Sequence, residues 1–134
     1  MPVSIARSGS YNGDNGTTAS FDVSHSTGSY LFVVVQDDST GHAATAQMGS
    51  VTVGGQAMTL LGVNPTTNTG HKAHMEIWGI GTNNASFDAL TGSQNVVFGS
   101  SVTDMKITFA LVTDCDPTTV STIGWDDTTG NRTS

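Results

Sequence analysis

Apolar residues alternate with polar ones in short runs along most of the chain, which is the pattern of half-buried β-strands. The runs with this pattern are 3–7, 18–24, 50–53, 56–61, 73–80, 94–98 and 105–113. Residues 30–35 are apolar on both faces, which is typical of a central strand covered above and below or placed between subunits. We therefore predict one domain over residues 1–134: an all-β antiparallel sandwich, jelly-roll-like or Ig-like, with about nine short strands.

Turn-forming residues divide these runs. Gly54-Gly55 separates two of them, and a pair of glycines between strands is typical of a two-residue hairpin with positive φ. Residues 8–16 are rich in Gly, Asn and Ser and predict a loop. Residues 39–49 predict a second loop, with room for a short helical turn at Ala43, Ala44 and Ala46. Residues 114–134 have few apolar anchors, so we expect an irregular or partner-dependent tail.

The composition excludes an all-helical protein. The chain has 16 Gly, 15 Ser, 21 Thr and 8 Asn among 134 residues, and these types favour strands and turns over helix interiors. Only four residues are Lys or Arg against eleven acidic ones, which gives a net charge of −7. Binding to a phosphate backbone or to an anionic bilayer needs clustered Lys and Arg side chains, and this chain has only four. We therefore predict neither a nucleic-acid partner nor a membrane partner.

The single cysteine and the first residues bear on the compartment. Cys115 cannot form an internal disulfide, and we expect it to be a small buried hydrophobe rather than a reactive thiol. The N-terminus has neither a basic region nor an apolar stretch of a signal peptide, so we expect synthesis in a cytoplasm without a cleaved leader. No run approaches the 18 consecutive apolar residues that are typical of a membrane-spanning helix, so we predict no such helix.

Histidines and acidic pairs are the candidate metal ligands. His71 and His74 are three residues apart, which places them on opposite faces of a strand, so a structural or solvent-exposed role is favoured over a shared metal. His25 and His42 lie in loops, and a metal site assembled from several loops stays open. The acidic clusters 37–38, 114–116 and 126–127 could offer oxygens to calcium, but none has an EF-hand pattern, and turn capping is favoured.

No catalytic motif is present: the chain has no nucleophile elbow, no P-loop, no dinucleotide fingerprint after a strand and no Cys-x-x-Cys. We therefore predict a protein that is not an enzyme and that needs no cofactor. Four aromatic residues, Tyr11, Tyr30, Trp78 and Trp125, could form a sugar-stacking platform. Trp78 lies within a regular strand and is expected in the core, whereas Trp125 lies in the tail and could anchor a partner.

Three segments carry a resemblance to a known group of proteins. They read S-V-T-V-G-G-Q-A-M-T-L-L-G at 50–62, M-E-I-W-G-I at 75–80 and T-G-S-Q-N-V-V-F at 91–98. This pattern resembles β-sandwich structural proteins of tailed bacteriophages and bacterial surface or secreted β-domains, over roughly residues 29–113. The resemblance implies a sandwich that is jelly-roll-like or Ig-like.

The resemblance and the missing catalytic motifs together favour a virion protein. We expect a capsid decoration or cement protein, a homo-oligomer with a trimer favoured, that binds the major capsid protein or another virion protein on the capsid surface, at a symmetry axis or between capsomers. Termini and turn loops are free to reach neighbours, so the expected contact residues are Met1, Val3, Ile5, Arg7, Tyr11 and Trp125. The alternative is a glycan-binding adhesin or a tail-fibre, receptor-binding domain, and an enzyme is the least favoured class.

Overall fold

A computed structural model of the chain describes residues 2–13, 17–37, 48–63, 74–100 and 105–120. These residues form nine strands and one short helix, so the prediction of an all-β protein with about nine strands is confirmed. The elements are β1 (Ser4–Gly13), β2 (Thr18–Asp22), β3 (Tyr30–Asp37), β4 (Val51–Val53), β5 (Gln56–Ala57), β6 (Thr59–Val63), β7 (His74–Gly81), α1 (Ala85–Asp88), β8 (Ser93–Phe98) and β9 (Met105–Thr113). The suggested helical turn at 43–46 and the tail beyond residue 120 lie outside the described residues.

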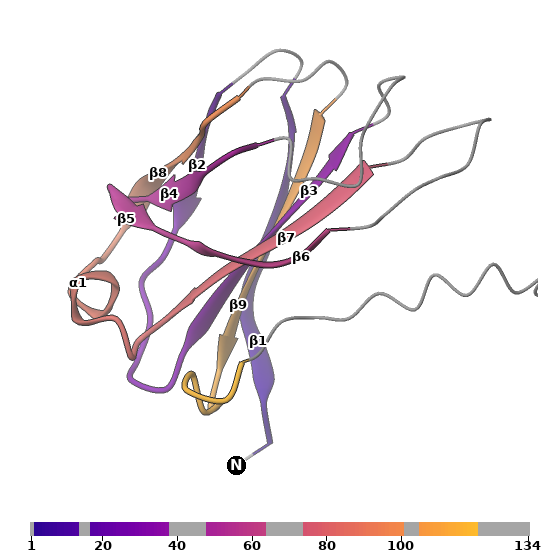
Figure 1. Cartoon of the computed structure of the whole chain (residues 1–134). Coiled ribbons are helices and arrows are strands. Elements are labelled where there is room, and N and C mark those ends of the chain that lie inside the picture. The colour runs from indigo at the N-terminus through magenta and orange to yellow at the C-terminus, as the bar shows by residue number, and fades with distance from the viewer. Residues whose placement is uncertain (1, 14–16, 38–47, 64–73, 101–104, 121–134) are drawn as a thin grey trace, which may run out of the picture.

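The strands form two antiparallel sheets that pack as a sandwich (Figure 1). One sheet has the order β1-β9-β3-β7-β6 and the other has the order β2-β8-β4-β5. The pairing is nested: β1 pairs with β9, β2 with β8, β3 with β7 and β4 with β5. This nesting is the jelly-roll arrangement. An Ig-like sandwich would pair its first two strands in one sheet, whereas β1 and β2 lie in different sheets here.

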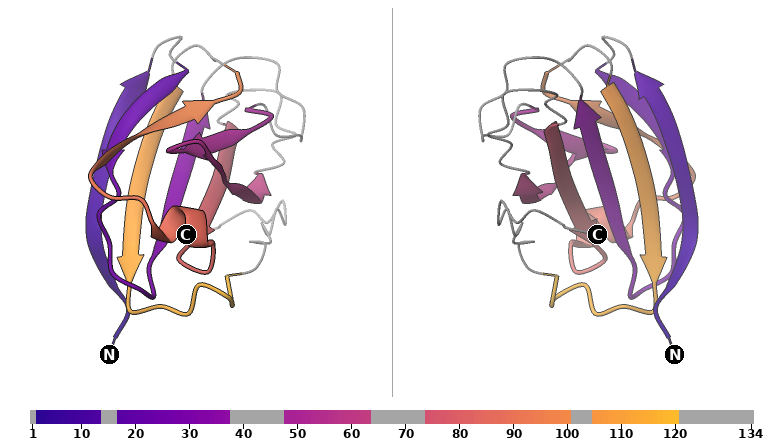
Figure 2. Two further views of the ribbon diagram at one scale, coloured as in Figure 1. Left: turned by 90° about the vertical axis from the view of Figure 1, so that its left-hand side faces the viewer. Right: turned by 90° about the vertical axis from the view of Figure 1, so that its right-hand side faces the viewer.

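β3 lies at the centre of the five-stranded sheet, as its apolar sequence predicted. It pairs with β9 on one side and with β7 on the other (Figure 2, right-hand view). Leu31, Val33 and Val35 point into the sandwich and are 0% exposed. The core between the sheets is completed by Ala19, Val23, Met48, Val51, Val53, Met58, Trp78, Ile80, Phe87, Val96, Phe98, Met105, Ile107, Phe109 and Leu111.

The first strand is longer than the sequence predicted. Residues 8–13 were expected to form a loop, but they continue β1 and pair with β9 from Ser8 opposite Ala110 to Gly13 opposite Met105. The expectation is wrong for this segment because tertiary pairing with a long neighbouring strand outweighs the turn preference of its Gly and Asn residues. Residues 14–16, the rest of the predicted loop, lie outside the described residues.

The Gly54-Gly55 hairpin is confirmed, but the strand after it is not continuous. Gly54 and Gly55 have φ of 53° and 79°, and they join β4 to β5. The predicted strand 56–61 divides at Met58, so that β5 belongs to the four-stranded sheet and β6 to the five-stranded sheet. Met58 is buried, and its amide donates to the carbonyl of Val51. Because of this division, one segment of the chain supplies the edge strand of each sheet, β5 in one and β6 in the other.

One helical turn, α1, was not predicted. It lies between β7 and β8 at one end of the sandwich (Figure 1). Asn84 caps it, because its side-chain oxygen accepts hydrogen bonds from the amides of Ser86 and Phe87 at 3.0 and 3.1 Å. Phe87 is fully buried and fills this end of the core. The turn therefore serves to carry one aromatic side chain into the sandwich.

Candidate interaction surface

Four of the six contact residues expected from the sequence lie on or next to one edge strand. β1 is the end strand of its sheet, and in the described part of the chain it pairs only with β9. Val3, Ile5 and Tyr11 are 62%, 67% and 42% exposed, and they belong to the few large hydrophobic residues that the structure exposes. Met1 and Trp125 lie outside the described residues. The structure thus brings together Val3, Ile5, Arg7 and Tyr11 along one edge, which we call the β1 edge.

A β-bulge at Ala6 sets the directions of the β1 side chains. The register with β9 shifts between Ile5, which is opposite Val112, and Arg7, which is opposite Leu111. Val112 is on the outer face of the sheet and Leu111 is in the core, and directly paired residues share a face. The bulge therefore places Ile5 on the outer face and turns Arg7 toward the other sheet.

Arg7 is engaged within the chain. Its Nη1 lies 3.5 Å from a carboxylate oxygen of Asp22 and donates a hydrogen bond to the carbonyl of Ser24. Both charged side chains are more than a third exposed, so the ion pair contributes little to stability. The pKa of Asp22 is lowered mainly by hydrogen bonds from the amide and the hydroxyl of Ser24, with a smaller contribution from Arg7. Arg7 therefore joins the edges of the two sheets, and Val3 and Ile5 are left exposed. Tyr11 lies opposite the core residue Ile107, so it is on the same face as Arg7, and it is 42% exposed at the edge.

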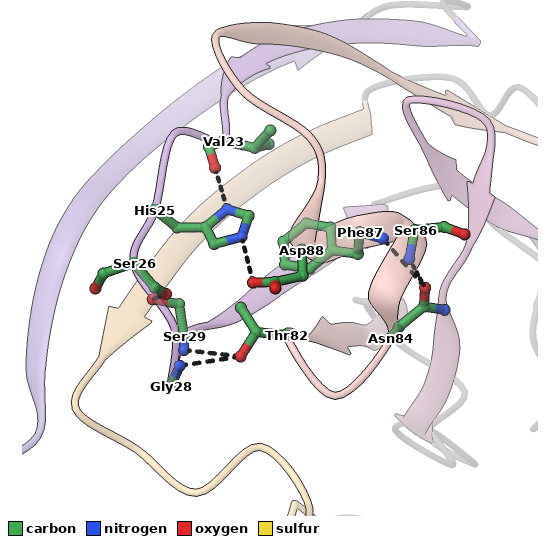
Figure 3. Close-up of polar contacts among 10 residues, drawn as sticks. All are labelled: Val23, His25, Ser26, Gly28, Ser29, Thr82, Asn84, Ser86, Phe87 and Asp88. Carbon is green, nitrogen blue, oxygen red and sulfur yellow. Dashed lines mark hydrogen bonds and ion pairs between the residues drawn. The ribbon is translucent and has the colours of Figure 1, made fainter.

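The segment after β2 places His25 against α1. The imidazole of His25 stacks on the ring of Phe87, with centroids 4.8 Å apart and planes 7° apart (Figure 3). Its Nδ1 lies in hydrogen-bond contact with the carbonyl of Val23, which can only accept, so Nδ1 carries a proton. Nε2 points to the Asp88 carboxylate at 3.5 Å. The side chain of His25 is 2% exposed, so this imidazole packs α1 onto the loop between β2 and β3.

The hydroxyl groups near His25 are occupied by the backbone. Thr82 Oγ1 accepts from the amides of Gly28 and Ser29 at 3.1 and 3.3 Å, and Ser29 Oγ donates to the carbonyl of Ser26 (Figure 3). These bonds hold the loop after β2 against the end of β7. These contacts form a structural corner, and among the described residues no hydroxyl is hydrogen-bonded to the imidazole of His25.

A polar cluster that the sequence analysis missed lies in the core on β7. Glu76 is 0% exposed; its Oε1 lies 2.8 Å from His74 Nε2 and accepts from the amide of Met48 at 3.2 Å. Its Oε2 accepts a hydrogen bond from Trp78 Nε1 at 2.8 Å. The sequence did contain a signal for this cluster. His74, Glu76 and Trp78 are two residues apart, and this spacing places all three side chains on one face of a strand. Hydrogen bonds from several groups offset the cost of burying this carboxylate.

The structure gives His74 and Trp78 structural roles, as expected. Both are at most 5% exposed and both contact Glu76. Tyr30 is also buried, so of the aromatic residues considered for a sugar platform only Tyr11 is exposed in the described part of the chain. Trp125 lies outside it. The described members of that platform therefore do not come together on the surface.

One residue of the acidic clusters, Asp116, caps a turn, as expected, whereas Asp37 lies in β3. Asp116 accepts hydrogen bonds from the amide and hydroxyl of Thr118 at 2.9 and 2.6 Å, and these bonds lower its pKa. Asp38, Asp126 and Asp127 lie outside the described residues, as do His42 and His71. Within residues 2–13, 17–37, 48–63, 74–100 and 105–120, no three His, Cys, Asp or Glu side chains are grouped so that they could hold a metal ion.

Cys115 is half-buried, so the expectation that it is buried in the core is wrong. It follows β9 in a turn at the edge of the sandwich, where its Sγ donates to the carbonyl of Gly28 at 3.4 Å. Desolvation raises the pKa of the thiol, a backbone hydrogen bond opposes this in part, and the carboxylates of Asp116 and Asp114 add smaller upward contributions. The thiol is thus held in its protonated form.

Comparison with protein-family models, with curated proteins and with solved structures gives no match to this chain. Among the described residues, no helix has the length and apolar character needed to cross a bilayer.

Proposed function

We propose that this chain is a non-enzymatic virion structural protein, a capsid decoration or cement protein of a tailed bacteriophage that binds the assembled head. The observation that carries the proposal is the β1 edge. It is an edge strand of ten residues, and Val3 just before it and Ile5 within it are 62% and 67% exposed. A soluble protein with such an edge usually protects it or pairs it with another chain.

The protection of the β1 edge is slight. Its protective features are the bulge at Ala6 and the charge of Arg7, which is turned toward Asp22, and both lie in the first half of the strand. Bulges, inward-pointing charges, lysine and proline are the usual means of keeping a second strand away, and residues 8–13 have none of them. An extended segment of a shell protein can therefore add to the sheet through main-chain hydrogen bonds, with apolar contacts to Val3 and Ile5.

The jelly-roll order also fits this proposal. Jelly rolls serve as building blocks of viral capsids and of lectins, and one fold supports many functions. Binding to the assembled shell and not to free subunits would stabilise the shell by RT ln(1 + [L]/Kd), about 2.7 kcal/mol at a concentration one hundred times Kd. The partner in this proposal is the major capsid protein or another virion protein, and the location is the capsid surface.

The direct test is the number of copies of this chain in purified particles, measured by quantitative mass spectrometry against the most abundant shell protein. A ratio near one or a simple fraction supports decoration of the head. A few copies per particle would instead indicate a tail position, which includes the receptor-binding alternative, and absence from particles would contradict any virion role.

The contact itself is tested by charge substitution on the β1 edge. We expect Ile5→Asp to lower particle occupancy at least tenfold in a binding assay with stripped particles. The matched control is Val97→Asp, because Val97 is 41% exposed on β8 of the other sheet. Equal occupancy of both variants and the unchanged protein would overturn the assignment of the β1 edge as the contact.

A further inference from the structure

A second surface lies over β3 and β7, on the same outer face of the five-stranded sheet as Ile5, and the inference drawn from it does not depend on the proposed function. Residues paired across antiparallel strands share a face. Tyr30, Phe32 and Val34 of β3 point away from the core, since their neighbours Leu31, Val33 and Val35 are the buried ones. Their partners on β7 are Gly81, Gly79 and Ile77, respectively. This outer row of β3 and β7, which we call the outer face, is therefore apolar.

The margin of the outer face on the β9 side is polar at one end only. Val34 pairs with Thr108 and Gln36 pairs with Lys106 on β9, and both of these partners are exposed. At the other end, Tyr30 and Phe32 pair with Val112 and Ala110, which continue the apolar surface. Phe32, Val34 and Ile77 are only partly exposed. An apolar strip on a sheet face is the pattern of a docking surface.

The chain itself begins to cover this face after β9. Asp114 has φ of 58°, and the amide of Cys115 donates to the carbonyl of Gly28, so the chain turns back at the end of the strand. A Cβ added to Gly81 would lie 2.6 Å from Cβ of Pro117. Because Gly81 pairs with Tyr30 and faces outward, Pro117 lies on the outer face.

The described chain then ends at a cavity on the same face. A cavity of about 240 Å³ is lined by Tyr30, Leu61, Gly79, Pro117 and Val120 together with the polar residues Thr59, Asn83, Asn84 and Thr118. It is smaller than the roughly 300–1,000 Å³ of ordinary ligand pockets, so it suits a protein side chain better than a small molecule. Val120 is the last described residue, and fourteen residues of the sequence follow it.

We propose that residues 121–125 of the same chain dock on the outer face, with Ile123 and Trp125 packed against the cavity and against Phe32, Val34 and Ile77. Ile123 and Trp125 are the apolar residues that follow Val120 in the sequence. Five extended residues span at most about 17 Å. The row of Val34 and Ile77 lies four strand residues from the row of Tyr30 and Gly81, or about 13 Å, so it is within reach.

Acrylamide quenching of tryptophan fluorescence tests this docking in the full chain. The only tryptophans are Trp78, which is 5% exposed, and Trp125. We expect the fluorescence of the folded chain to be quenched at least threefold less than that of the urea-unfolded chain. We also expect Trp125→Phe to leave the quenching curve without the loss of a readily quenched component, because both tryptophans are protected. A readily quenched component that disappears in Trp125→Phe would overturn the proposal, because Trp125 would then be in solvent.

A pair of substitutions on the outer face provides the matched control. Ile77→Asp should release Trp125 and at least double the quenching, whereas Thr108→Asp, in the same row but at the exposed margin, should leave it unchanged. Far-ultraviolet circular dichroism verifies that both variants fold. If Ile77→Asp folds and Trp125 stays protected, the docking site is wrong.

Sedimentation over a range of concentrations identifies which copy of the chain supplies the docked segment. If the protection of Trp125 is lost when the protein dissociates to monomers, the docked segment comes from a second copy, and the same-chain assignment is overturned.

Discussion

Trp78 donates a hydrogen bond of 2.8 Å from its indole nitrogen to Oε2 of Glu76, and both side chains are buried between the sheets. A buried carboxylate depends on such donors, because its charge and lone pairs have lost their water. The bond also orients the largest side chain of β7. It explains why a glutamate is compatible with a position that the sequence pattern reserves for apolar residues.

The first prediction concerns this bond. Trp78→Phe keeps an aromatic ring in the core but removes the donor, so we expect the free energy of unfolding to fall by about 1–3 kcal/mol. Urea unfolding measures it. The same substitution on a Glu76→Gln background should cost less, because the bond is already weakened there. Equal costs on the two backgrounds would show that packing alone is responsible.

The second prediction concerns Gly79. A Cβ at this position would lie within 3.0 Å of the Tyr30 ring and of Leu61, so Gly79→Ala should destabilise the fold by about 1–3 kcal/mol. Gly9→Ala is the control, since its Cβ would meet Phe21 at an ordinary 3.5 Å. We expect the control to change stability by less than about 0.5 kcal/mol. On a Tyr30→Ala background the cost of Gly79→Ala should shrink, and an undiminished cost would refute the steric explanation.

The third prediction is a pH dependence that arises from Asp22. Its pKa is lowered below 3.8 in the folded state, chiefly by the hydrogen bonds from Ser24, so the ionised form favours folding. The stabilisation is complete above the unfolded pKa near 3.8 and is lost as the pH falls through the lower folded value. Urea unfolding at neutral pH should therefore show Asp22→Asn less stable than the unchanged protein, and the difference should vanish in strong acid. A difference that persists at low pH would mean that the charge of Asp22 is not its cause.

The fourth prediction concerns Cys115. Because desolvation and the nearby Asp116 and Asp114 raise the pKa of the thiol, iodoacetamide should alkylate the folded protein with a pH profile shifted above that of the unfolded chain. Asp116→Asn should move the profile part of the way back. Coincident profiles for the folded and unfolded protein would contradict the raised pKa.

The sequence by itself determined the class of fold and the positions of most strands. The alternation of apolar and polar residues predicted the two-layer β-architecture, and the doubly apolar residues 30–35 predicted the central strand β3. The Gly54-Gly55 turn was predicted because its positive φ angles are available to few other residues. Each of these features depends on residues that are close together in the sequence, so it can be predicted from one segment alone.

Only the tertiary structure decided how the strands are connected and which polar groups are buried. The extension of β1 to Gly13 depends on β9, about a hundred residues away, and the division at Met58 depends on both sheets at once. The acceptance of Glu76 in the core depends on donors from Met48, His74 and Trp78. The exposed β1 edge likewise follows from its place at the end of a sheet. Pairing and burial are interactions between segments distant in sequence, and periodicity within one segment does not contain them.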